Sequence, residues 1–121
     1  MLVNDFYVIT QQESGAEFIR ATIDFQKGHP VFGGHFPGHP IVPGVCMIQI
    51  VREFMELVES KKLRIHTGEN IKFLSIINPL QNSSVKVDIA FRLDTDTYAV
   101  QASLFSDQVT YFKFKGCFQV L

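Results

Sequence analysis

The sequence has no tryptophan and only two cysteines among its 121 residues. Cys46 and Cys117 lack the spacing of a metal site or a redox pair, and two free thiols suit a reducing compartment. We therefore expect no metal and no cofactor. No apolar run reaches the roughly 18 residues of a membrane span, and the first residues lack the pattern of a signal peptide. These absences favour a cytoplasmic protein that does not enter the membrane.

An excess of basic charge is also missing. Eleven lysines and arginines face twelve aspartates and glutamates, for a net charge of −1, so binding to nucleic acid or to an anionic membrane is not expected. The length and the 46% hydrophobic content fit a single globular domain over residues 1–121. Twelve phenylalanines fit a ring-packed core, or else a pocket for an apolar ligand.

The pattern of apolar residues predicts several strands and one helix. Alternation predicts strands at residues 2–10 and 16–25, and later at 62–78, 85–92, 98–104 and 112–120. In the segment 62–78 we expect an early break at 66–68 and one face formed by Ile71, Phe73, Ser75 and Ile77. A single apolar helix among strands needs a sheet curled around it. Long outer strands also favour a symmetric dimer.

The helix is predicted from Pro43 or Gly44 to about Ser60, with Pro43 suited to the first helical position. Apolar residues lie around most of its circumference, which predicts burial on nearly all sides over the first two turns. The remaining residues form a narrow polar stripe: Gln49, Arg52, Glu53, Glu56 and Ser60.

The segment from Gly33 to Gly44 differs from the rest of the chain. It holds half of the eight glycines and three of the five prolines, which predicts irregular backbone of the kind that often carries function. Residues 35–44 read HFPGHPIVPG. The pattern HFPxxPxxPG resembles the signature of bacterial 3-hydroxyacyl-[acyl carrier protein] dehydratases, and residues 72–79 carry a weaker similarity to the strand that follows the helix in that family.

The resemblance implies an α+β hotdog fold, with one long central helix wrapped by a curved antiparallel sheet and paired as a dimer. It implies an enzyme that removes water from a 3-hydroxyacyl thioester to give the trans-2-enoyl thioester, in fatty-acid or related lipid biosynthesis. The thioester would be carried by acyl carrier protein or coenzyme A. This reaction needs a base for the C2 proton, an acid for the C3 hydroxyl, and donors for the carbonyl oxygen.

Two residues of the motif fit these needs. His35 fits the base because imidazole titrates near neutrality, although a loop histidine can simply be hydrogen-bonded in place. Gly44 fits the carbonyl holder because unpaired N–H groups lie at a helix start and glycine allows close approach. Gly44 can also be an ordinary helix-start glycine. Both readings remain open for each residue.

The acid is where the sequence departs from the family. Members carry Glu or Asp fourteen residues after the motif histidine, where this chain has Gln49. An amide has no proton to transfer, so Gln49 either orients the hydroxyl or heads the polar stripe. A substitute acid could be Glu53, about 6 Å further along the helix, or His35 could shuttle the proton alone. His29 and His39 are expected to be loop or surface residues.

In the family the site lies at the dimer interface, so His35 would face Gln49 of the partner, and higher oligomers are possible. Phe36, Val45, Ile48 and Phe73 are candidates to line an acyl tunnel, and each could equally belong to the core. Three functions remain open: a dehydratase, a weak or inactive homologue that binds acyl thioesters or a sister subunit, and a hotdog thioesterase. Fold alone does not choose among them.

Overall fold

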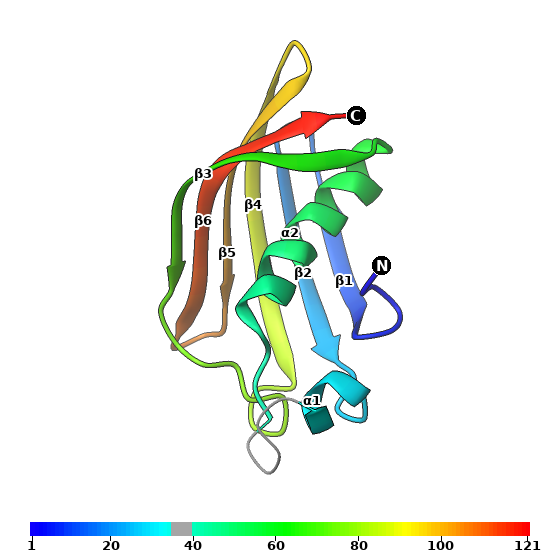
Figure 1. Ribbon diagram of the computed structural model, residues 1–121, viewed down its shortest axis with the longest axis vertical. Coiled ribbons are helices and arrows are strands. Elements are labelled where there is room, and N and C mark those ends of the chain that lie inside the picture. Colours follow the sequence, from blue (N-terminus) through cyan, green and yellow to red (C-terminus); the bar gives the residue numbers. More distant parts are fainter. Residues whose placement is uncertain (35–39) are drawn as a thin grey trace.

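The computed structural model describes residues 1–34 and 40–121. Along the chain the elements are β1 (Tyr7–Ser14), β2 (Phe18–Phe25), α1 (Pro30–Gly34), α2 (Gly44–Glu59), β3 (Leu63–Phe73), β4 (Ser84–Asp94), β5 (Thr97–Phe105) and β6 (Thr110–Val120). All strand pairs are antiparallel, in the sheet order β1-β2-β4-β5-β6-β3. The sheet curves around α2, which lies along its inner face (Figure 1). This is the predicted α+β hotdog fold.

The core forms between α2 and the inner face of the sheet. The predicted alternation is confirmed in β2, β4, β5 and β6, where every second side chain is buried. From the strands come Ile19, Ile23, Val85, Val87, Ile89, Val100, Leu104, Phe112 and Phe118, and from the helix Met47, Ile50, Val51, Phe54 and Met55. Apolar side chains on one face of each strand therefore define which side of the sheet receives the helix.

The first strand was predicted too early. It begins at Tyr7 and not at Leu2, because the chain before it makes a tight turn. Asn4 has a φ of 65°, in the left-handed region, and the N–H groups of Asp5 and Phe6 both donate to the Leu2 carbonyl. That turn brings the N-terminal segment beside α2 instead of extending the sheet.

Strand β3 also differs from its prediction. The expected break at 66–68 is wrong, because the strand continues through it with irregular register on either side of Gly68. The expected single face of residues 71–77 is wrong as well: the strand ends at Phe73, which is 54% exposed, and only Ile77 is fully buried. As an edge strand, β3 is hydrogen-bonded to a neighbouring strand, β6, along one edge only.

Helix α2 has nearly the predicted bounds, but its environment differs. Pro43 is the N-cap, with extended backbone, and Gly44 is the first helical residue. Ser60 ends the helix in the left-handed region, and its N–H donates to the Glu56 carbonyl. Burial on nearly all sides is wrong for the single chain, since Val45 is 74% exposed. Within residues 1–34 and 40–121, no helix is long and apolar enough to cross a membrane.

Candidate active site

Two of the predicted site residues, His35 and Phe36, lie outside the described residues, as does His39. The other predicted site residues lie on α2 or on β3. His29 is described, and its ring nitrogen Nε2 lies 3.1 Å from Oδ2 of Asp5. Its other ring nitrogen accepts a hydrogen bond from the Val31 N–H, so His29 is held as a loop residue, as expected.

The start of α2 at Gly44 has no side-chain cap from the described residues. Pro43, the N-cap, has no side chain that can accept from the helix. The first N–H groups of a helix have no partner within it, and the positive end of its dipole lies there. An anion or a polarised carbonyl oxygen is the natural ligand for such an end.

Phe73 from β3 packs directly against this helix start. A Cβ added to Gly44 would lie 2.7 Å from Cε1 of the Phe73 ring, too close for any real side chain. The ring in turn stacks on Phe112, with 5.2 Å between centroids. The structure therefore brings Gly44 and Phe73 together, and the absence of a side chain at Gly44 is what allows the contact.

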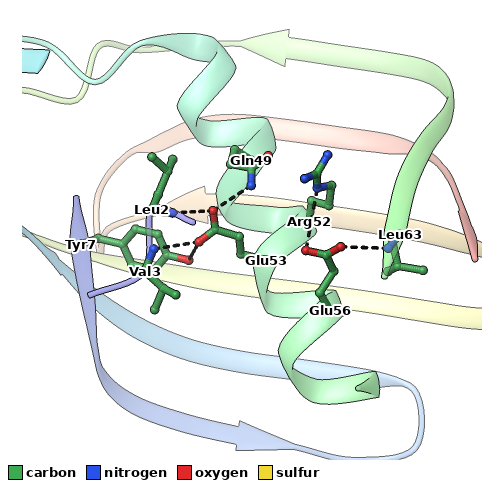
Figure 2. Close-up of polar contacts among 8 residues, drawn as sticks. All are labelled: Leu2, Val3, Tyr7, Gln49, Arg52, Glu53, Glu56 and Leu63. Atoms are coloured by element: carbon green, nitrogen blue, oxygen red, sulfur yellow. Dashed lines mark hydrogen bonds and ion pairs between the residues drawn. The ribbon is translucent and has the colours of Figure 1, made fainter. Parts of the chain in front are cut away.

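Gln49 lies just over one turn beyond Gly44 and is half-buried. Its amide Nε2 donates to Oε2 of Glu53 at 2.8 Å, so these residues, four apart on the helix, form one unit. Figure 2 shows the Gln49 nitrogen directed at the Glu53 carboxylate. The two stripe residues thus interact with each other and not only with solvent.

Glu53 is fully buried and accepts hydrogen bonds from the N-terminal segment, from β1 and from α2 itself. Besides Gln49, the backbone N–H groups of Leu2 and Val3 donate at 2.7 and 2.8 Å, and the Tyr7 hydroxyl donates at 3.1 Å (Figure 2). Each carboxylate oxygen receives two of the four bonds. Such full satisfaction is what offsets the cost of burying a carboxylate.

Burial and the charge of Glu53 raise the pKa values of two neighbouring groups. Burial raises the pKa of the Tyr7 hydroxyl, and the charge of Glu53 and the hydrogen bond to it raise that pKa further. Burial also raises the pKa of the Cys46 thiol, with a second contribution from Glu53. Both groups therefore stay protonated at neutral pH, and Cys46 does not have the character of a reactive thiolate.

A second carboxylate, Glu56, lies near the end of α2. Its Oε2 accepts from the Leu63 N–H at 2.8 Å, and its Oε1 lies 3.9 Å from Nε of Arg52 (Figure 2). This group joins the end of the helix to the start of β3. Its contacts with Leu63 and Arg52 hold these parts of the chain together.

The sequence did not reveal that Glu53 is an anchor inside the protein. It was placed in the polar stripe, whereas the structure gives it the burial of a core residue. One signal was available: Glu53 follows the apolar Ile50 by three residues, so both lie on neighbouring parts of the helix surface. Its partners in the N-terminal segment lie about fifty residues away and could not be inferred from spacing.

The predicted lining residues are only partly enclosed in the single chain. Ile48 is half-buried, while Val45 and Phe73 are 74% and 54% exposed. Exposed apolar side chains continue along the segment after β3, at Leu74 and Ile76. A hollow of about 530 Å³ on the sheet is lined by Phe18, Lys72, Lys113 and others, and by none of the predicted site residues. The helix start is the better candidate because its unpaired N–H groups can hold a carbonyl oxygen or an anion.

Comparisons with known proteins identify the family of the chain. The model of the ApeI-like family, described as ApeI dehydratase, matches residues 10–114. The 3-hydroxyacyl-[acyl-carrier-protein] dehydratase FabZ of Caulobacter vibrioides strain NA1000 / CB15N is 33% identical over 92 residues, which cover 75% of this chain and 54% of the relative. The chain thus spans about half the length of that curated relative.

Solved structures share the fold. A chain of the dehydratase heterocomplex ApeI:P from Xenorhabdus doucetiae superposes with a TM-score of 0.75 at 20% identity, covering 93% of this chain and 96% of that one. A mutant thioesterase from Pseudomonas aeruginosa gives 0.61 at 13% identity, covering 93% and 81%. At these identities the structures establish the fold alone. The match of the family model over most of the chain shows that the protein belongs to the ApeI-like, FabZ/FabA-related family of hotdog dehydratases.

Proposed function

We propose that the protein dehydrates 3-hydroxyacyl thioesters to trans-2-enoyl thioesters at the start of α2. One observation supports this most directly: the helix begins at Gly44 with no side-chain cap from the described residues, and Gln49 follows just over one turn later. The curated relative is named for this reaction on acyl carrier protein. We infer the same class of substrate here, carried by acyl carrier protein or by coenzyme A.

The residues divide the reaction between them. His35 takes the C2 proton, and the first N–H groups of α2 at Gly44 hold the carbonyl oxygen as negative charge develops on it. Gln49 accepts a hydrogen bond from the C3 hydroxyl or from a water beside it, but it has no proton to donate. The leaving hydroxyl is then protonated by the imidazolium of His35 or by water.

The site is completed by a second subunit in this proposal. His35 of one protomer faces Gln49 of the other, and the acyl chain runs beside α2 past Phe36, Val45, Ile48 and Phe73. Support comes from the apolar side chains left exposed near the helix start and from the uncovered edge of β3. A homodimer satisfies both features.

A second candidate is a binding homologue that works with a sister subunit. It is favoured by the neutral Gln49, since losing a general acid costs on the order of 10²–10⁴ in rate. One structural neighbour is itself described as a dehydratase heterocomplex. A sister subunit that carries a carboxylate at the equivalent helix position would supply the missing acid.

A single assay distinguishes these functions. The purified protein is mixed with a 3-hydroxyacyl thioester of acyl carrier protein, and enoyl product, free thiol and bound complex are measured. We expect enoyl product, and a loss of about 10²–10⁴ in rate for His35→Ala. His66→Ala, at an exposed position on β3, is the matched control and should keep the rate.

Other outcomes lead elsewhere. Binding without turnover would support the homologue that needs a sister subunit, and release of free thiol would indicate a thioesterase. Equal rates for His35→Ala and His66→Ala would contradict the proposed base.

A further inference from the structure

We propose that Glu53 is a positioning residue that fixes the Gln49 amide with its carbonyl oxygen turned away from Glu53, so that the site presents an acceptor. The inference rests on the proposed function in one respect only, namely that Gln49 faces the substrate. It replaces the expectation that Glu53 is a substitute acid.

The Glu53 carboxylate has no acceptor position to spare. Four neighbours direct hydrogens at it: two backbone N–H groups, the Tyr7 hydroxyl and the Gln49 amide. A carboxylate offers about four acceptor positions, and all are used. An arrangement built from donors fits an ionised group, which has no proton to give to a leaving hydroxyl.

The Glu53 carboxylate also fixes the orientation of the Gln49 amide. An amide has one donor end and one acceptor end, and only the donor end is compatible with a carboxylate 2.8 Å away. A flipped amide would bring two oxygens together inside the protein. The Gln49 oxygen is therefore directed away from Glu53, where it can accept from a substrate hydroxyl or a water.

Other charged and titratable groups lie around Gln49 and Glu53. From β1 comes Tyr7, and from α2 come Cys46 and Arg52; Arg52 lies beside Glu56. Tyr7 and Cys46 stay neutral because their pKa values are raised, first by burial and then by Glu53. Among residues 1–34 and 40–121, no cation pairs with Glu53, so its hydrogen-bond donors alone compensate it.

The test is nuclear magnetic resonance of the side-chain amides of the intact protein, which does not depend on turnover. Solvent exchange of the Gln49 NH₂ signals is compared with that of the exposed Gln101 and Gln108. We expect exchange at least about tenfold slower at Gln49, since its NH₂ group is hydrogen-bonded in a half-buried position. Rapid exchange in the wild-type protein, equal to that of Gln101, would overturn the proposal whether or not any variant folds.

Variants add a matched comparison. Glu53→Gln introduces an amide that can accept at one atom only, so the protection at Gln49 should fall several-fold. Glu56→Gln removes a comparable carboxylate on the same helix that contacts Leu63 and not Gln49, and should leave the protection unchanged. Full protection in Glu53→Gln would overturn the proposal.

Kinetics separate positioning from stability. With the 3-hydroxyacyl thioester, Glu53→Gln should lower kcat about tenfold with little change in KM, while Glu56→Gln should leave both constants near wild type. Equal kcat in the two variants would overturn the positioning role. If the wild-type protein shows no turnover, the proposed function fails while the exchange measurement still decides the orientation of Gln49.

Discussion

Helix α2 carries two pairs of polar residues four apart, and they are used in different ways. Gln49 and Glu53 join a neutral amide to a fully buried carboxylate with four hydrogen bonds. Arg52 and Glu56 join opposite charges at 3.9 Å, with a single hydrogen bond from Leu63. Among the described residues, the buried carboxylate is therefore held by hydrogen-bond donors and not by a cation.

The family resemblance implies a carboxylate at position 49, and the difference between the two pairs explains why an amide fits there. A carboxylate at position 49 would lie beside the Glu53 carboxylate, and like charges at this distance cannot both be ionised inside a protein. Gln49 is therefore compatible with Glu53 as it stands. Gln49 and Glu53 form one hydrogen-bonded unit in which the charge lies on the buried Glu53.

The largest effect on stability is expected for Glu53→Ala. It leaves one buried and three part-buried donors without their acceptor, and an unsatisfied buried donor costs about 1–3 kcal/mol, so the free energy of unfolding should fall by about 3 kcal/mol. Urea denaturation measures this change. A fall no larger than that of Glu56→Ala would show that the two pairs are equivalent.

A smaller effect is expected for Gln49→Glu. The two adjacent carboxyl groups would share a proton, so the folded-state pKa of one rises above its unfolded value of about 4.3. A raised carboxyl pKa means that the folded state binds more protons. Stability relative to wild type should therefore fall as pH rises from about 4 to 7, by about 1.4 kcal/mol for each unit of pKa shift.

Thermal or urea unfolding across this pH range gives the measurement. The double variant Gln49→Glu with Glu53→Gln restores one amide and one carboxylate, and it should lose this pH dependence. A pH dependence of the same size in both variants would mean that positions 49 and 53 do not interact.

The smallest effect is expected for Glu56→Ala. It removes one hydrogen bond from the Leu63 N–H and a partly exposed ion pair, which together contribute about 1 kcal/mol. Urea denaturation measures this loss. The rate of dehydration, measured separately with the 3-hydroxyacyl thioester, should stay normal because the contact joins the helix end to β3. A large loss of activity would place this end of the helix in the site.

The sequence allowed most of the sheet to be predicted. Strands β2, β4, β5 and β6 have one face in the core, and burial of one face imposes the alternation that was recognised. Edge strand β3 lacks this constraint, so neither its continuity nor its faces followed from the pattern. The N-terminal turn was missed because its hydrogen bonds to Glu53 span about fifty residues.

The candidate site was predicted from a different kind of signal. The helix start at Gly44 followed from proline and glycine positions, which act locally. The partners of Gln49 and the contact of Gly44 with Phe73 depend on tertiary packing. Local backbone rules therefore located the helix start, while the hydrogen bonds of Gln49 required the structure.

The central claim is that His35 removes the C2 proton while the N–H groups at Gly44 hold the carbonyl oxygen, and that position 49 supplies only an acceptor. Its most direct test is incubation of the protein with a 3-hydroxyacyl thioester in D₂O, followed by mass spectrometry of the recovered substrate and product. Dehydration is reversible, and addition of D₂O to the enoyl product returns a deuteron to C2. We therefore predict deuterium at C2 of the recovered substrate with the wild-type protein and with His66→Ala, and none above background with His35→Ala. A wild-type protein that binds the thioester without incorporating deuterium would contradict the account.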